Sequence, residues 1–349
     1  MKIKTGILGC TGAVGQKLIA LLSGHPDFEI TEIAASEQSS GSTYESRVNW
    51  KESSPIPDSV KKMQIKKCEP ELDAKVLFSG LDSSVAGEIE AQLAKAGYIV
   101  ISNSKNHRMD EDVPLVIPEI NQEHFHLLKF QIERWRSGGY IVTNPNCSTI
   151  ALAISLYPIY KNFGLSRVIV TSMQAISGAG YPGVPSLDIL GNIIPYIKDE
   201  EEKIESETLK ILGAFEKGRI NFADFKISAS CNRVPVREGH LLSVSVETLK
   251  KATKEEIINS LYEIKNFGYN FSPEKVIDYS EDEFKPQPLT DANIDKGMRI
   301  TIGRMRKCSV LDWKYTALGH NTIRGAAGAA ILNAEWLLHN GYLERIEKQ

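Results

Sequence analysis

One cysteine of the chain lies in a turn that could make its sulfur reactive. The run NPNCST at 144–149 follows an apolar stretch at 140–142 and precedes another at 150–157. We interpret these stretches as a strand and a helix, with Asn144 and Pro145 ending the strand. Cys147 then lies in the first turn of the helix, where unpaired backbone N–H groups favour an anion. The pattern predicts a thiolate nucleophile, and the same N–H groups could hold an oxyanion.

The remaining cysteines give no sign of a metal site or a disulfide framework. The chain has five cysteines without CxxC spacing, at positions 10, 68, 147, 231 and 308. We therefore expect no bound metal, and we interpret the other four thiols as small buried hydrophobic groups. The N-terminus does not resemble an export signal, so we expect the reducing cytoplasm as the location.

A second motif, GCTGAVG at 9–15, joins a predicted strand at 2–8 to a predicted helix at 14–23. Glycines in such a turn let a pyrophosphate approach the backbone, and the helix N-terminus favours its charge. The alternative is a tight structural turn, but the strand–turn–helix context favours a dinucleotide site. The cofactor-binding candidates here are Gly9, Thr11, Gly12, Ala13, Val14 and Gly15.

The loop after the second predicted strand should select the type of dinucleotide. It reads ASEQSSG at 35–41, and serines in this place favour the 2′-phosphate of NADP(H), whereas an acidic residue favours NAD(H). Ser36, Ser39 and Ser40 therefore indicate NADP(H), and Glu37 argues mildly for NAD(H). An ordinary solvated turn would have a similar composition.

These motifs need a scaffold, and the pattern of apolar runs supplies one. In the first half we expect strands at 2–8, 30–35, 75–79 and 98–102, with helices at 14–23 and 85–96. This alternation predicts a parallel sheet covered by helices. In the second half we expect strands at 167–176, 227–236, 240–247, 298–304 and 311–318, with helices at 149–160 and 257–266. The charged stretch 273–295 holds three prolines and should be an irregular surface segment.

The chain is thus expected to be an α/β protein of two domains. A Rossmann-type dinucleotide-binding domain should span 1–146, with a C-terminal helix within 322–349 packing back on it. An α+β catalytic and dimerisation domain with a mixed sheet should span 147–321. The formal net charge of −3 over 349 residues gives no reason to expect nucleic acid or an anionic membrane as partner. No apolar run approaches the ~20 residues that cross a bilayer.

Several longer runs resemble aspartate-β-semialdehyde dehydrogenase, in the branch shared by archaea and fungi. They include GILGCTGAVGQKL, SNSKNHRMDEDVPLVIPEIN, VTNPNCSTI, QAISGAGYPG, GNIIPYIKDEEEKI, CNRVPVREGH and HNTIRGAAG, in family order over nearly the whole chain. The resemblance implies NADPH-dependent reduction of L-aspartyl 4-phosphate to L-aspartate 4-semialdehyde, a step in lysine, threonine and methionine biosynthesis. It also implies a homodimer or homotetramer.

The resemblance further implies roles for individual residues. Cys147 would be the nucleophile, His240 the general acid/base and Gln174 an orienting residue beside the thiol. Arg233 would bind the substrate α-carboxylate and Glu201 its ammonium, although Glu200 or Glu202 could replace Glu201. The expected phosphate ligands are Lys203 and Arg108, and the expected contacts of the nicotinamide end are Ser177, Gly178 and Asn321.

Three alternatives stay open at this point, one for the cofactor and two for the function. Relatives often carry an Arg and a Lys that grip the 2′-phosphate, where this chain has Gln38 and Ser42. This leaves dual use of NAD(H) open. The activity could also be that of a malonyl-CoA or related acyl-CoA reductase on the same scaffold, or the protein could be a dinucleotide sensor without catalysis. The intact NPNCS run favours the acyl-phosphate enzyme over the acyl-CoA one. N-acetylglutamyl-phosphate reductase has a glycine where this chain has Asn146.

Overall fold

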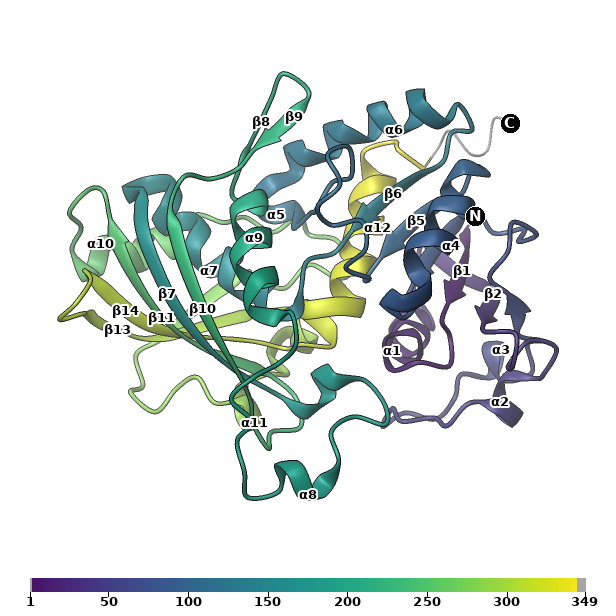
Figure 1. Ribbon diagram of the computed structural model, residues 1–349, viewed down its shortest axis with the longest axis horizontal. Coiled ribbons are helices and arrows are strands. Elements are labelled where there is room, and N and C mark those ends of the chain that lie inside the picture. The colour runs from purple at the N-terminus through teal and green to yellow at the C-terminus, as the bar shows by residue number, and fades with distance from the viewer. Residues whose placement is uncertain (1, 344–349) are drawn as a thin grey trace. The chain divides into compact units, whose positions relative to one another are not determined.

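A computed structural model describes residues 2–343 and divides the chain into two compact units (Figure 1). The first unit comprises residues 1–116, 123–144 and 326–349, and the second comprises 117–122 and 145–325. Relative to the sequence-based boundaries, the short segment 117–122 joins the second unit. The chain passes from the first unit to the second at residue 145 and returns to the first at residue 326, whereas the sequence-based boundaries were 147 and 322.

The first unit is built on a six-stranded parallel sheet. Its strands are β1 (Ile3–Leu8), β2 (Phe28–Ala35), β3 (Lys66–Lys67), β4 (Val76–Ser79), β5 (Ile99–Ser102) and β6 (Tyr140–Thr143). The order β3-β2-β1-β4-β5-β6 reverses direction between β1 and β4, which is where doubly wound sheets bind dinucleotides. Strands β4, β5 and β6 are buried along their whole length, as expected of parallel strands covered on both faces.

Helices cover this sheet, including one from the end of the chain. The longer ones are α1 (Ala13–Leu22), α4 (Ser83–Lys95), α6 (Leu128–Trp135) and α12 (Gly328–His339). Helix α12 contacts α1 and β5, and its buried Glu335 lies 3.2 Å from Nε2 of His25. Helix α12 thus packs against elements of the first unit, and residues 344–349 of the range expected for a C-terminal helix lie outside the described part.

The second unit contains a mixed six-stranded sheet in the order β10-β7-β11-β14-β13-β12. Its strands are β7 (Leu165–Gln174), β10 (Lys226–Arg233), β11 (His240–Thr248), β12 (Ile277–Ser280), β13 (Ile300–Lys307) and β14 (Trp313–Gly319). The pairs β10–β7 and β12–β13 are parallel, and the other three are antiparallel. The α/β fold class with a mixed second sheet is confirmed.

One face of this sheet carries the helices α7 (Cys147–Phe163), α9 (Glu200–Ile211) and α10 (Lys254–Leu261) (Figure 1). The opposite face exposes small or polar residues such as Ser228 and Ser230, together with Ile169. The expectation of an irregular segment at 273–295 was wrong for β12, because the apolar Val276 and Ile277 are buried and let this short run pair with β13 as an edge strand.

The shorter elements complete the chain. They are α2 (Tyr44–Arg47), α3 (Asp58–Lys61), α5 (Pro118–Asn121), η1 (Gln122–Leu127), η2 (Ile176–Ala179), α8 (Ser186–Ile189), β8 (Ala214–Glu216), β9 (Arg219–Asn221), α11 (Pro288–Asp291), η3 (Ile294–Gly297) and the π-turn η4 (Ile323–Ala327). Among residues 2–343, none of the helices combines the length and apolarity needed to cross a bilayer.

Candidate active site

The expected reactive cysteine is the first residue of helix α7. Asn146 caps this helix, since its side-chain oxygen accepts hydrogen bonds from the N–H groups of Ser148 (2.9 Å) and Thr149 (3.2 Å). The cap therefore occupies two of the backbone N–H groups that the sequence analysis considered as donors to an oxyanion. The positive end of the helix dipole remains beside the sulfur, where it favours the thiolate over the thiol.

The capping residue is itself held by two carboxylates of α9. The Asn146 side-chain amide donates to Glu200 at 2.8 and 3.1 Å, and its backbone N–H donates to Glu207 at 2.6 Å. Asn146, Glu200 and Glu207 are all buried. The start of α7, and with it the position of Cys147, is therefore fixed by charged groups of a neighbouring helix.

His240 faces the cysteine from the first position of strand β11. Its Nε2 lies 3.1 Å from Sγ of Cys147, and its Nδ1 accepts the backbone N–H of Ala175 at 3.1 Å. Because Nδ1 accepts, the proton of the neutral ring is on Nε2, so His240 donates to the sulfur. Complete burial, aided by the charge of Arg233, lowers the pKa of His240 to about 3 and keeps the ring neutral.

Strand register explains why these groups meet. Arg233 ends β10 and Gln174 ends β7, and the two residues are paired in the parallel ladder. Strand β11 runs antiparallel to β7, so its first residue, His240, lies at the end of the sheet where β7 and β10 finish. The sequence-predicted residues Arg233, Gln174 and His240 therefore gather at one end of the sheet, next to the start of α7.

Arg233 is buried and donates from Nη1 to the carbonyl oxygen of Ala175 at 2.8 Å. Burial lowers the pKa of Arg233, while Cys147 and Glu200 act in the opposite direction. The guanidinium is thus a fixed donor close to the nucleophile. A planar donor of this kind is suited to a carboxylate.

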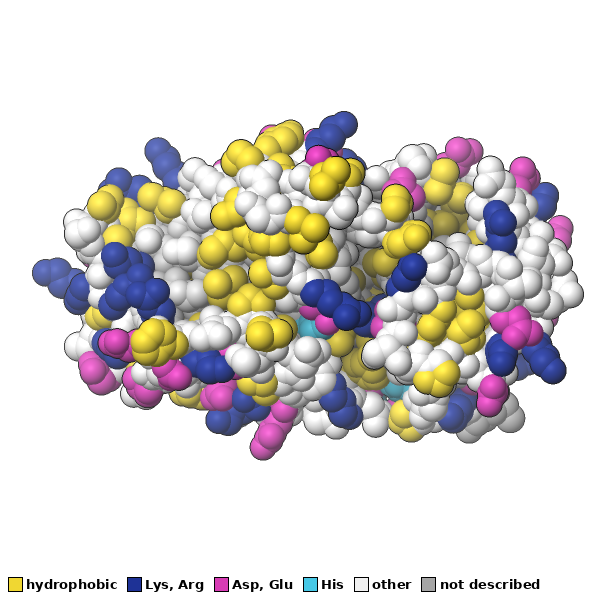
Figure 2. Space-filling view, turned by 90° about the horizontal axis from the view of Figure 1, so that it is seen from below, with side chains coloured by type: hydrophobic (Ala, Val, Ile, Leu, Met, Phe, Trp, Pro, Cys, Tyr) yellow, Lys and Arg dark blue, Asp and Glu magenta, His cyan; other side chains and the backbone are white. Residues whose placement is uncertain are grey.

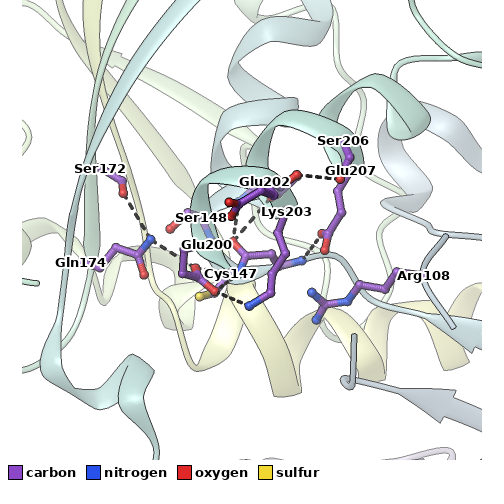
Figure 3. Close-up of polar contacts among 12 residues, drawn as sticks. Arg108, Cys147, Ser148, Ser172, Gln174, Glu200, Glu202, Lys203, Ser206 and Glu207 are labelled. Carbon is purple, nitrogen blue, oxygen red and sulfur yellow. Dashed lines mark hydrogen bonds and ion pairs between the residues drawn. The ribbon is translucent and has the colours of Figure 1, made fainter. Parts of the chain in front are cut away.

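Glu200, rather than Glu201, is the member of the acidic cluster that joins this group. Glu200 accepts from Lys203 Nζ (2.8 Å) and from the amide of Gln174 (3.3 Å), as Figure 3 shows. Burial disfavours ionisation of Glu200, but the Lys203 ammonium and the Asn146 and Gln174 amides outweigh it and lower the pKa of Glu200 below its usual range. Glu200 is therefore an ionised anchor at the centre of the site.

Glu201 has a different function in the fold. Its carboxylate accepts the backbone N–H of Cys231 at 2.9 Å, and Glu205, one turn later, accepts that of Ala229 at 2.9 Å. Both N–H groups lie on β10, the edge strand of the sheet, and would otherwise lack a ladder partner. Helix α9 thus presents Glu200, Lys203 and Glu207 on one face and Glu201 and Glu205 on another.

The residues expected at the nicotinamide end form a connected loop cluster. The amide of Asn321 donates to Ser177 Oγ at 2.8 Å, and its oxygen accepts the N–H of Gly239 at 2.9 Å. A Cβ added to Gly178 would lie 3.0 Å from Nη1 of Arg233 and 3.1 Å from Cε1 of His240. Only glycine therefore leaves the face of these two side chains uncovered.

The sequence analysis missed three residues that support the nucleophile. A Cβ on Gly325 would lie 2.7 Å from Cβ and 2.9 Å from Cα of Cys147. The neighbouring Arg324 forms a fully buried ion pair with Glu119 of α5 at 2.8 Å. The third is Asn146, whose position just before a helix was a recognisable N-cap signal. Gly325 and Arg324 both lie in the family-like run HNTIRGAAG, and the ion-pair partner Glu119 lies in PEIN, but no local pattern indicates their contacts.

In the first unit, the glycine loop has the geometry that a dinucleotide requires. Gly9 adopts φ +72°, a Cβ there would lie 2.7 Å from the Gly80 carbonyl oxygen, and a Cβ on Gly15 would overlap the Gly9 carbonyl oxygen. Gly12 caps α1 without a side-chain hydrogen bond. The backbone of residues 12–14 is not fully buried and lies at a helix N-terminus, so the loop fits a pyrophosphate.

The other expected ligands of the first unit follow β2 and β5. Ser36 and Ser39 lie in a turn directly after β2, with the Ser39 N–H bonded to the Ser36 carbonyl at 2.9 Å. Glu37 lies 3.3 Å from the Lys67 ammonium. Arg108 is buried on the loop after β5 and donates to the Asn103 carbonyl at 2.8 Å.

The four other cysteines differ from Cys147. Burial raises the pKa of Cys10 to about 12 and that of Cys68 and Cys231 to about 11, so these remain thiols. Cys68 and Cys308 are only half-buried, which corrects the expectation that both are fully buried. Backbone N–H groups of Leu311 and Val310 lower the pKa of Cys308.

Comparison with known proteins identifies the family of the chain. The family model "Semialdehyde dehydrogenase, NAD binding domain" matches residues 4–128, and "Semialdehyde dehydrogenase, dimerisation domain" matches 156–324. An aspartate-semialdehyde dehydrogenase from Archaeoglobus fulgidus is 49% identical over 97% of this chain and 98% of its own length.

Solved structures give the same picture. The crystal structure of aspartate semialdehyde dehydrogenase with NADP from Candida albicans has a TM-score of 0.91 at 39% identity, over 98% of this chain and 100% of that one. Aspartate semialdehyde dehydrogenase II complexed with ASA from Vibrio cholerae has a TM-score of 0.75 at 26% identity, over 97% and 99% of the two chains. The expected resemblance is confirmed: the chain belongs to the aspartate-semialdehyde dehydrogenase family.

Proposed function

We propose that Cys147 carries the aspartate-semialdehyde dehydrogenase activity of this family, reducing L-aspartyl 4-phosphate to L-aspartate 4-semialdehyde with NADPH. The observation that carries the proposal is the 3.1 Å contact between Sγ of Cys147 and Nε2 of His240 at the start of a capped helix. Acyl transfer to sulfur needs such an activated thiolate.

We propose the following roles in substrate binding for charged residues of the two units. Arg233 binds the α-carboxylate through its planar donors. Glu200 binds the ammonium in place of Glu201, whose carboxylate is engaged by the Cys231 N–H. Lys203 and Arg108 bind the phosphate. These contacts orient the substrate carbonyl toward the nucleophile, and such positioning can account for much of an enzyme's rate enhancement.

In the reductive direction the thiolate attacks the carbonyl carbon of the acyl phosphate. A C–S bond forms, the bond from that carbon to the bridging oxygen breaks, and phosphate leaves with its charge neutralised by Lys203 and Arg108. A bound NADPH supplies the hydride that reduces the resulting thioester. The aldehyde then separates from the sulfur, which returns to a thiolate hydrogen-bonded by Nε2–H of His240.

The role of His240 is refined by its tautomer. A ring that accepts the Ala175 N–H at Nδ1 already holds a proton at Nε2, so it cannot also accept the thiol proton there. We propose that His240 acts first as a hydrogen-bond donor to the thiolate and to the oxyanion of the hemithioacetal. Its expected action as general acid/base requires that the Ala175 hydrogen bond be given up during turnover.

We propose that the glycine loop with Gly9, Gly12 and Gly15 binds the pyrophosphate of the cofactor. Thr11, Ala13 and Val14 belong to the same turn. Ser36 and Ser39 favour NADP(H). Ser177, Gly178 and Asn321 are proposed to hold the nicotinamide end.

The decisive assay is phosphate-dependent reduction of NADP⁺ by aspartate semialdehyde. The wild-type protein should be active, and Cys147→Ser should bind NADP⁺ normally but lose turnover. Activity of Cys147→Ser within tenfold of wild type would rule out the nucleophile. Oxidation of malonate semialdehyde in the presence of CoA, without activity on aspartate semialdehyde and phosphate, would instead establish the acyl-CoA reductase alternative.

We further propose that the second unit forms a homodimer. The segment 181–196 exposes Tyr181, Leu187, Leu190, Ile193 and Tyr196, each at least 58% exposed. The view from below, the side on which α8 lies in Figure 1, shows many hydrophobic side chains at the surface (Figure 2). Apolar surface of this kind is typical of a subunit interface. Light scattering should give a dimer or tetramer for the wild type and a smaller species for a Leu187→Asp/Leu190→Asp variant. An unchanged mass would contradict the assignment.

A further inference from the structure

The loop after β2 raises a question about cofactor choice that its own residues do not answer. Gln38 and Ser42 are uncharged, so the turn at 36–42 has serines but no cation of its own for a doubly charged phosphate. The only charged residue in the turn is Glu37, which would repel one. The sequence alone therefore left the preference between NADP(H) and NAD(H) undecided.

The fold brings a cation to this turn from the next helix. Arg47, the last residue of α2, donates from Nε to Oγ of Ser39 at 3.3 Å. Ser39 is buried, whereas Arg47 is exposed, so the guanidinium covers the hydroxyl from the solvent side. Within residues 2–343, Arg47 forms no ion pair with a carboxylate, so its charge is available to an anion.

Helix α2 is anchored to the glycine loop, which fixes where Arg47 lies relative to the dinucleotide site. The buried Tyr44, in the same helix, donates its hydroxyl to the Cys10 carbonyl at 2.8 Å. Gln16 of α1 donates to the Thr11 carbonyl at 2.8 Å and to the Asn49 carbonyl at 3.2 Å. The segment that carries Arg47 is thus attached to the pyrophosphate turn on both sides of α2.

The repulsion that Glu37 would exert on a phosphate is reduced by a neighbouring cation. The carboxylate of Glu37 is 83% exposed and lies 3.3 Å from Lys67 Nζ of β3. Lys66, the other cation of β3, pairs with Glu32. The acidic group is therefore partly neutralised, while Arg47 stays beside Ser39. The balance of charge at the end of β2 favours a dianionic group over a neutral ribose hydroxyl.

We propose that Arg47 determines the preference for NADP(H) by binding the 2′-phosphate of its adenosine ribose together with Ser39. The proposal rests on the proposed function, since it concerns the cofactor of that reaction. A guanidinium offers several N–H donors to phosphate oxygens, and a charge-assisted contact of this type corresponds to roughly 10- to 100-fold in affinity. Arg47 is thus a specificity residue supplied by α2, in place of the loop positions occupied by Gln38 and Ser42.

The test uses two probes that differ only in the 2′-phosphate, adenosine 2′,5′-bisphosphate and 5′-AMP, with binding measured by calorimetry. Arg47→Gln should weaken the bisphosphate at least tenfold and leave 5′-AMP within twofold, and Arg47→Lys should restore part of the loss. Lys61→Gln is the matched control, because Lys61 is a partly exposed cation of the neighbouring helix α3 that pairs with Glu45 at 3.7 Å. It should leave both affinities unchanged.

Equal losses for both probes, no loss for either, or the same selective loss in Lys61→Gln would each overturn the proposal. Steady-state kinetics should agree with binding: in Arg47→Gln the KM for NADP⁺ rises, while kcat and the KM for NAD⁺ stay near wild type. Because the binding measurement needs no substrate, it also separates the two claims. A wild-type protein that binds the bisphosphate but does not oxidise aspartate semialdehyde refutes the proposed function alone.

Discussion

Adding one methyl group beside the nucleophile should separate catalysis from stability. A Cβ on Gly325 would lie 2.7 Å from Cβ of Cys147 and 2.9 Å from its Cα. Ordinary van der Waals contact begins near 3.4 Å, so the gap is about 0.7 Å too small, and the atoms that must move belong to the nucleophile and its backbone. We therefore expect Gly325→Ala to displace the start of α7 by several tenths of an ångström or more.

The catalytic cost of this displacement follows from the precision that such sites need. Reactive groups have to be held to within about 0.5 Å, and an error near 1 Å costs roughly 100-fold in rate. Gly325→Ala should thus lower kcat for phosphate-dependent oxidation of aspartate semialdehyde by about 30- to 100-fold. It should also slow alkylation of Cys147 by iodoacetamide, because the sulfur moves away from Nε2 of His240.

Gly164→Ala is the matched control at the other end of α7. Its Cβ would lie 2.9 Å from Leu249, and its φ of +68° is strained for alanine, so it should lower the thermal midpoint. It should nevertheless leave kcat within about threefold. If Gly325→Ala kept wild-type kcat, or if Gly164→Ala lost as much, the close contact at Cys147 would not be what positions the sulfur.

Three further predictions concern buried charges. The pKa of His240 is lower in the folded protein than in the unfolded chain, so the unfolded chain binds a proton more readily. The free energy of unfolding should therefore fall as pH drops below about 6.5, and this residue should account for a loss of roughly 2–3 kcal/mol at pH 4.5. In denaturant titrations, His240→Gln should lose less unfolding free energy than wild type between pH 7 and 4.5. Glu200→Gln should lower kcat/KM by at least tenfold, whereas Glu201→Gln should mainly lower stability. Glu119→Gln, which leaves Arg324 unpaired, should cost roughly 3–5 kcal/mol of unfolding free energy, and Glu119→Leu/Arg324→Met should recover much of it.

Each of these has a clear opposite result. Equal acid sensitivity of wild type and His240→Gln would mean that this ring does not govern acid stability. A larger kinetic effect of Glu201→Gln than of Glu200→Gln would return the ammonium-binding role to Glu201. A double variant no more stable than Glu119→Gln would show that the ion pair itself, rather than the lone charge left behind, determines the loss.

The sequence predicted the longer strands of both sheets because most of them carry a local signal of their own. Strands such as β4 and β5 are short apolar runs bounded by turns, and the apolar run of α7 follows the turn that Asn144 and Pro145 signal. The nucleophile could be identified for the same reason, since the strand–turn–helix punctuation around Cys147 is local. The edge strand β12 was missed because it is four residues long within a charged segment.

Contacts between distant residues could not be predicted in this way. Three consecutive glutamates start α9, and a shift of one residue turns a side chain by about 100° around the helix. Which of them enters the site depends on where the helix begins, and the left-handed Asp199 (φ 59°) fixes that point at Glu200. The contacts of Arg47 with Ser39 and of Gly325 with Cys147 likewise join residues that no spacing rule connects.

The central claim is that one sulfur becomes covalently acylated, and mass spectrometry tests it directly. Wild-type protein incubated with L-aspartyl 4-phosphate in the absence of reductant should gain one aspartyl group, and peptide mapping should place it on Cys147. The adduct should disappear on addition of NADPH and should be missing in Cys147→Ser. An adduct on another residue, or full turnover without acylation of Cys147, would contradict the account.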